Sequence, residues 1–170
     1  NMLVSQHYGT HFARIPLKAS ADIQNDNALK IMWAAVDYIF GNPPFVGSKL
    51  MSPEQKESFN KISNVVANSG ILDFVSAWHL KATEYMKANP HVETAFVSTN
   101  SITQGEQVAA LWDYIFAQSM QIHFAHRTFQ WSNEAKGVAA VHCVIIGFSI
   151  HRPNNPIIYD YETPKSNPQA

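Results

Sequence analysis

The sequence predicts an α/β fold, and three observations support that prediction. Short apolar runs typical of strands alternate with stretches of helical periodicity across residues 38–131. The strand predicted at 38–40 ends in a glycine and a stiff proline-rich tip, and open α/β sheets bind their ligands at the carboxyl ends of strands. Two long runs near the end of the chain, 122–131 and 138–150, are rich in aromatic or β-branched residues. We expect these two to pair as an antiparallel hairpin beside parallel strands.

Length and composition predict one globular domain with a proper core. The chain has 170 residues, of which 46% are hydrophobic, and a net charge of −1. This charge excludes a protein that coats nucleic acid by charge alone, so any DNA contacts are local or lie elsewhere. The chain opens at Asn1 in the middle of a pattern, and we expect it to be part of something longer.

Cysteine usage and hydropathy predict the compartment. The single cysteine, Cys143, excludes an internal disulfide and fits a reducing environment. No apolar run reaches membrane-spanning length, and no signal peptide is visible. We therefore expect a cytoplasmic protein with no membrane partner.

The chain is organised around a rigid tip that follows the strand predicted at 38–40. Gly41 tolerates the sharp turn that must follow the strand. Pro43 pushes Asn42 out of the helical region, and Pro44 does the same to Pro43. Neither proline has a backbone N–H, so the Asn42 amide and the nearby carbonyls face outward as polar groups. Phe45 adds an aromatic face beside them. The simplest interpretation is a proline-rich turn after a strand.

This tip resembles the catalytic motif of amino-methylating DNA methyltransferases, Asp/Asn/Ser-Pro-Pro-Tyr/Phe, and its form resembles the adenine-N6 branch. An exocyclic amine is a poor nucleophile because its lone pair is conjugated with the ring. The Asn42 side-chain oxygen and the Pro43 carbonyl could accept both amine hydrogens and stabilise the nucleophilic form. Phe45 could stack on a base taken out of the helix. Catalysis is thus expected at Asn42, Pro43, Pro44 and Phe45.

The segment before the tip and the loop after it are expected to hold the donor and the target. Residues 25–27 form a loop signal, and Asn27, Ala28 and Leu29 resemble the segment of this fold that meets the adenine of S-adenosylmethionine. A plain loop before an edge element is the alternative interpretation. Lys49 lies in the short loop that leaves the tip and is expected close to a flipped base and its phosphates. The alternative interpretation is that Lys49 is simply a solvated surface residue.

Two helices are predicted next. Ser52 and Gln55 form a capping box that starts a helix running to about residue 68. A second helix is predicted from Asp73 to Asn89, and its apolar stripe is interpreted as core. The stripe consists of Phe74, Trp78, Ala82 and Tyr85.

The remaining elements complete the sheet. A short parallel strand is predicted at 95–98, and the polar residues 99–101 at its end should lie beside the tip. Residues 103–106 form a capping box for another helix. A polar loop at 132–137 separates the last two predicted strands. Residues 152–170 contain four prolines and are expected to be a tail or a linker.

The resemblance extends beyond the tip to MmeI-like enzymes, in which one long chain carries an endonuclease and an adenine methyltransferase. It is carried by residues 41–49, 97–107, 123–131 and 133–137, and covers most of 27–148. It implies a Rossmann-like class I methyltransferase sheet, S-adenosylmethionine as donor, duplex DNA as substrate and a restriction-modification context. Phe129 and Trp131, as plausible base-stacking residues, favour a nucleic-acid target.

One departure from the family pattern matters. None of the seven glycines lie close enough together to form its aromatic-x-Gly-x-Gly cofactor loop. We therefore interpret residues 1–151 as the catalytic, target-base part of a methyltransferase domain, inactive in isolation. Its expected partners are the remainder of that domain and a target-recognition domain in the same parent chain.

Other chemistries remain as alternatives or are excluded. Cytosine-N4 or protein-glutamine methylation uses related tips, and a non-catalytic module that binds DNA or a partner is a third possibility. His123 and His126 are three residues apart, on opposite faces of a strand, and no ligand-like partner is near them in the sequence, so no metal is predicted. Cys143 lies in an apolar run and is expected in the core rather than as a nucleophile.

Overall fold

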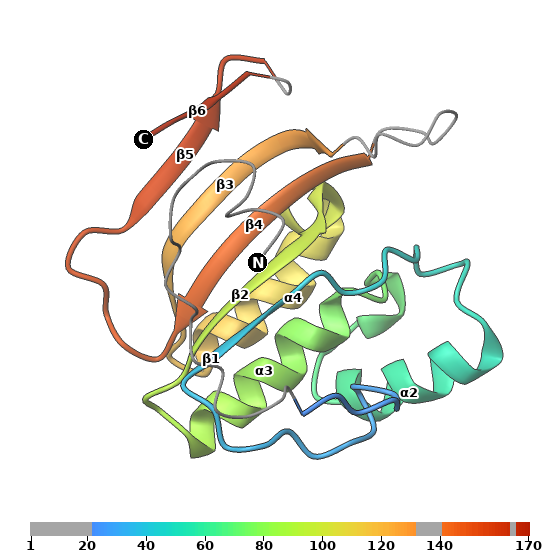
Figure 1. Cartoon of the computed structure of the whole chain (residues 1–170). Coiled ribbons are helices and arrows are strands. Elements are labelled where there is room, and N and C mark those ends of the chain that lie inside the picture. The colour runs from blue at the N-terminus through green and yellow to red at the C-terminus, as the bar shows by residue number, and fades with distance from the viewer. Residues whose placement is uncertain (1–21, 132–140, 164–165) are drawn as a thin grey trace, which may run out of the picture.

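The computed structural model describes residues 22–131, 141–163 and 166–170, and it confirms the α/β fold. A sheet with strand order β1-β2-β4-β3-β5-β6 packs against helices (Figure 1). The strands are β1 (Tyr38–Gly41), β2 (Glu93–Thr99), β3 (Gln121–Trp131), β4 (Val141–Ser149), β5 (Ile157–Tyr161) and β6 (Pro168–Gln169). The helices are α2 (Pro53–Ser63), α3 (Ser76–Ala88) and α4 (Glu106–Ala117), with short 3₁₀ turns at η1 (Ser69–Ile71) and η2 (Asn100–Thr103).

The strand pairing follows the prediction. β1 and β2 are parallel neighbours, with Gly41 opposite Phe96. β3 and β4 form the predicted antiparallel hairpin, and β4 also pairs antiparallel with β2. Cys143 lies opposite both Thr99 and Phe129. The end of β3 therefore reaches the same edge of the sheet as the ends of β1 and β2.

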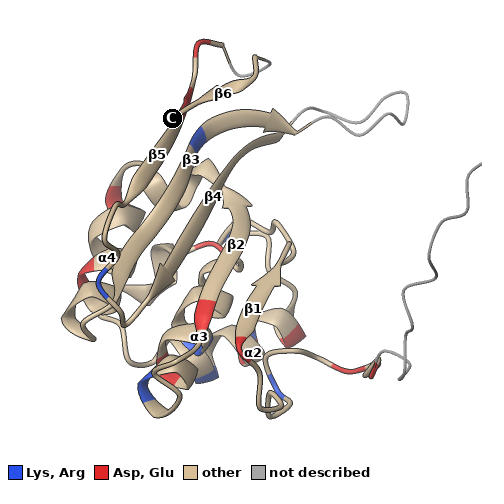
Figure 2. Ribbon diagram, turned by 60° about the vertical axis from the view of Figure 1, so that its left-hand side comes forward, with Lys and Arg blue, Asp and Glu red and all other residues tan. Residues whose placement is uncertain are grey.

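The core lies between the sheet and the helices, which cover one of its faces (Figure 1). Alternate residues of β2 and β4 point to that face because side chains of a strand alternate. Phe96 and Phe148 are among them, and both rings pack against His79 of α3. Charged residues lie mainly on the helices and turns, while the strands carry few of them (Figure 2).

The exposure of β1 differs from the prediction. The apolar run was expected to be a buried strand, yet Tyr38 is 68% exposed and Phe40 is 83% exposed. The reason is its position, because a parallel strand is buried only where the sheet continues on both sides and both faces are covered. β1 forms an edge of the described sheet, and the helices pack on its other face.

The helices differ from prediction at their ends and faces. The capping box of Ser52 and Gln55 is present, but α2 ends at Ser63 instead of near residue 68. The capping box expected at 103–106 is wrong, because Gly105 is the N-cap of α4, with φ of +63°, and no side chain caps it. The buried face of α3 consists of Ser76, Ala77, His79, Leu80, Ala82, Thr83 and Met86. Of the predicted stripe, Trp78 and Tyr85 are only half-buried.

The last segment is not the tail or linker expected for residues 152–170. β5 pairs in parallel with β3, placing Ile158 opposite Ala125 and Tyr159 opposite His126, and β6 pairs with β5. The polar loop predicted at 132–137 and the first residues of the predicted strand, 138–140, lie outside the described residues. None of the described helices combines the length and apolar character that crossing a bilayer requires.

Candidate active site

The tip closes one wall of an open cavity of about 440 Å³. Gly41 to Pro44 line it from one side, with Asn42 exposed and Pro43 buried. Trp33, Trp78 and Phe96 line other parts of it. Among the described residues, no hydrogen bond engages the Asn42 side chain, which is exposed and lines the cavity. A largely apolar cavity with a few polar groups at one end is typical of a small-molecule or base-binding site.

Of the three residues expected to meet the donor's adenine, Asn27, Ala28 and Leu29, only Ala28 lines the cavity. The Asn27 side chain is engaged within the fold, because its Oδ1 accepts the Leu29 N–H over 2.9 Å and its Nδ2 donates to Ser58 Oγ over 3.2 Å. Leu29 is buried in the core. Asn27 therefore shapes the loop, while Ala28 forms its cavity surface.

Lys81 of α3 holds this loop in place, which sequence spacing does not predict. Its Nζ donates to the carbonyl oxygens of Ala28 over 2.7 Å and Ile31 over 2.5 Å. The ammonium also lies 4.8 Å from the centre of the Trp33 ring, and the Trp33 indole N–H donates to the Ala28 carbonyl over 2.9 Å. Burial lowers the pKa of Lys81 from its ordinary value. The ammonium and the Trp33 indole thus fix this wall of the cavity.

Asp73 connects the polar strand end at Thr99 to Ser101 with the loop that follows the tip. Ser101 Oγ donates to Asp73 Oδ2 over 2.6 Å, and Thr99 Oγ1 lies 2.8 Å from Ser101 Oγ. Ser48 N–H donates to Asp73 Oδ1 over 3.0 Å. Sequence reasoning treated Asp73 only as the start of a helix and missed this contact, because its partners lie 25 and 28 residues away.

The predicted target-base residues are spread along one edge of the sheet. Phe45 is half-buried against the core, and Lys49 is exposed in the turn after the tip. Phe129 packs against Trp131 and Tyr161, with ring centroids 6.3 and 5.5 Å apart. β1 and β3 are separated by three strand spacings, so these aromatic rings lie about 14 Å along the edge from the tip.

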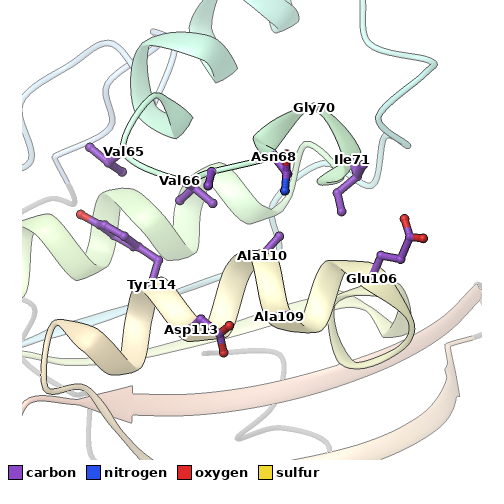
Figure 3. Close-up of a pocket in the computed structure, with 11 residues that line it drawn as sticks. Val65, Val66, Asn68, Gly70, Ile71, Glu106, Ala109, Ala110, Asp113 and Tyr114 are labelled. Atoms are coloured by element: carbon purple, nitrogen blue, oxygen red, sulfur yellow. The ribbon is translucent and has the colours of Figure 1, made fainter.

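A second cavity, of about 780 Å³, lies between α4 and the segment after α2 (Figure 3). The residues that line it include the apolar Val66, Ile71 and Ala110 and the acidic Glu106 and Asp113. It is larger than the cavity at the tip, and its polar lining residues are Asn68, Glu106, Asp113 and Tyr114. We assign the candidate active site to the smaller cavity because the strand-end tip lies there.

The remaining candidate groups are structural. Cys143 is buried, as predicted, and burial raises the pKa of its thiol, which disfavours the nucleophilic thiolate. His126 stacks on Tyr159 at 4.4 Å and its Nδ1 lies 2.8 Å from the Tyr161 hydroxyl. In the described ranges, no three His, Cys, Asp or Glu side chains gather as a metal-binding set.

Comparisons with known proteins identify relatives of this chain. The family described as "MmeI, DNA-methyltransferase domain" matches residues 1–160. The chain is 42% identical to DNA methyltransferase A of Bacillus subtilis (strain 168) over 142 residues, which cover 79% of this chain and 16% of that protein. A solved structure of the Type IIL restriction-modification enzyme MmeI in complex with DNA aligns with a TM-score of 0.84 and 46% identity, covering 99% of this chain and 23% of that one. The chain spans less than a quarter of the length of either relative.

Proposed function

The chain belongs to the MmeI DNA-methyltransferase domain family, and on that premise we propose that it forms the catalytic, target-base part of an adenine-N6 DNA methyltransferase. The observation that supports this proposal is the Asn42-Pro43-Pro44 tip, which opens onto the cavity lined by Trp33 and Trp78. The parent protein would act within a restriction-modification system, because the solved relative MmeI is a Type IIL restriction-modification enzyme.

The tip supplies acceptors for an amine. The Asn42 side-chain oxygen and the Pro43 carbonyl would accept the two amine hydrogens, which leaves the nitrogen lone pair free to attack a methyl carbon. The amine nitrogen would form the new N–C bond as the bond between the methyl carbon and the donor's sulfonium sulfur breaks, leaving a neutral thioether, and one amine proton would pass to water. S-adenosylmethionine, when bound, supplies the electrophilic methyl group. The planar indoles of Trp33 and Trp78 and the Ala28 surface fit the adenine ring of such a donor, and Asn27 would act by shaping that loop.

Duplex DNA and the rest of the parent chain are the proposed partners. Lys49, Phe45, Phe129 and Trp131 would face the target strand, because all four lie at the edge of the sheet that carries the tip. The exposed aromatic side chain of Phe40 lies on the sheet face away from the helices, where parallel sheets are normally covered. The remainder of the methyltransferase domain would cover this face, and a target-recognition domain would select the sequence.

Single-turnover methylation by the full-length parent, with tritiated donor and duplex DNA, tests the proposal. Asn42→Ala removes one of the two acceptors, and we expect the rate to fall at least roughly a hundredfold. Asn60→Ala, an exposed asparagine of α2, is the control and should keep the parental rate. Digestion of the product should yield N6-methyladenine. Recovery of N4-methylcytosine would favour the related chemistry instead, and an unchanged rate for Asn42→Ala would show that the tip is not the active site.

A further inference from the structure

Asp73 joins the loop after the tip to the end of the neighbouring strand. One carboxylate oxygen accepts the Ser48 N–H over 3.0 Å, and the other accepts the Ser101 hydroxyl over 2.6 Å. We propose that Asp73 is a positioning residue for methyl transfer, which holds the catalytic tip in its reactive orientation through these two bonds. This inference rests on the proposed function of the tip.

The backbone around Asp73 strengthens the connection. The next residue, Phe74, donates its N–H to the Val46 carbonyl over 2.9 Å, so the loop after the tip is bonded at both Val46 and Ser48. The Asp73 N–H itself donates to Gln107 Oε1 of α4 over 3.1 Å. The segment before α3 therefore connects the loop to both η2, which follows β2, and α4.

The tip transmits this restraint because it is stiff. Two consecutive prolines fix the backbone between Asn42 and Phe45. When Val46 and Ser48 are held, the backbone position of Asn42 is restrained through this short, stiff segment. A displacement of about 1 Å at a reacting group can lower a rate by up to roughly a hundredfold, even when the changed residue is remote from the chemistry.

A carboxylate suits this position better than its neutral analogue. Both partners are donors, and a carboxylate accepts at both oxygens without offering a hydrogen. An asparagine at position 73 can accept the Ser48 N–H with its one oxygen, but its NH₂ group would then face Ser101, whose hydroxyl would have to accept that bond instead of donating it. Asp73→Asn thus removes the negative charge and reverses the bond to Ser101, which weakens the bridge while the size of the side chain hardly changes.

The test is single-turnover methylation by the full-length parent at saturating donor and DNA, with donor affinity measured separately by calorimetry. For Asp73→Asn we expect a fall in rate of at least roughly tenfold, with donor affinity within about twofold of the parental value. Asp113→Asn is the matched control, because this exposed aspartate of α4 lies at the other cavity (Figure 3) and should leave the rate unchanged. A residue with a merely structural role would lower the melting temperature but not the saturated rate of the folded enzyme.

Ser101→Ala keeps the inference testable if Asp73→Asn does not fold. This change removes only one bond to the carboxylate, and we expect the saturated rate to fall by roughly threefold or more. The double variant should be no slower than Asp73→Asn, because both changes break the same bridge. Parental rates for the folded single variants would overturn the positioning role. A parental rate for Asn42→Ala, measured in the same series, would instead overturn the assignment of the tip.

Discussion

Lys81 Nζ lies 2.7 Å from the carbonyl oxygen of Ala28 and ties α3 to the loop that lines the candidate donor site. The same Nζ also donates to the Ile31 carbonyl oxygen, over 2.5 Å. Because the ammonium bonds to backbone atoms, it determines where the loop lies rather than which side chains it presents. This contact gives a prediction for donor binding that is separate from catalysis at the tip.

Lys81→Met in the full-length parent is expected to weaken S-adenosylmethionine binding by about fivefold to a hundredfold. The change keeps an apolar stem of similar length but leaves the Ile31 carbonyl without its charged donor. A carbonyl left unbonded costs about 1–3 kcal/mol, so the loop would leave its position to satisfy this group, and donor binding would have to restore that position. Calorimetric titration with the donor measures the effect. Lys87→Met on the same helix removes only a surface pair with Glu84 and should change the affinity little. Equal affinities for the two variants would contradict the role of Lys81.

His79 predicts a pH dependence of folding stability. The ring is fully buried, its Nδ1 lies 3.3 Å from the Val75 carbonyl, and it stacks on Phe148. Burial lowers the pKa of His79 from 6.5 to about 4. The unfolded chain therefore binds a proton between pH 6.5 and 4 that the folded chain does not, so the contribution is complete above 6.5 and decreases as the pH falls toward 4.

Urea unfolding of the chain at several pH values measures this effect. We expect His79 to lower the free energy of unfolding by roughly 3 kcal/mol between pH 6.5 and pH 4, at about 1.4 kcal/mol per pH unit. His79→Gln, which stays neutral, should lose less stability than the parent over this window, although it is less stable at pH 7. His91→Gln changes a mostly exposed histidine and is the matched control variant. If the free energy of unfolding fell with pH equally in the parent and in His79→Gln, the prediction would be contradicted.

Gly147 of β4 permits the ring of Phe124 to lie directly on the sheet. A Cβ at position 147 would come within 2.2 Å of that ring. Gly147→Ala is therefore expected to displace the ring and destabilise the chain by about 1–3 kcal/mol, in the range of overpacked cores. Gly70→Ala is the control, because a Cβ there meets nothing within 4 Å. Thermal unfolding of the two variants compares them directly, and equal melting temperatures would refute the close approach.

The sequence predicted those parts of the molecule that local chemistry determines. Proline and glycine restrict the backbone wherever they occur, so the tip from Gly41 to Phe45 and its place after a strand were predictable. The pairing of β1 with β2 followed from the rule that a strand, helix and strand in sequence form a parallel unit. Alternation and β-branching likewise identified β3 and β4.

The parts that were missed depend on residues far apart in the sequence. Lys81 meets Ala28 across 53 residues, and Asp73 meets Ser101 across 28. A helical lysine or a helix-start aspartate has many solvated alternatives, so spacing does not single out either. The exposure of β1 was missed for a related reason, because an apolar run does not indicate whether a neighbouring strand is present.

The last prediction concerns donor binding by this chain alone. Tyr38 and Phe40 line the cavity at the tip, yet 68% and 83% of their surfaces are exposed. A donor in this cavity would thus keep much of its surface in water, whereas tight small-molecule sites bury most of their ligand. We expect the dissociation constant of the 170-residue chain for S-adenosylmethionine to exceed about 100 μM, a binding free energy weaker than about −5.5 kcal/mol. Calorimetric titration of the chain beside the full-length parent tests this. Micromolar affinity in the isolated chain would mean that the cavity already holds the donor by itself, and that the remainder of the domain is not needed to close it.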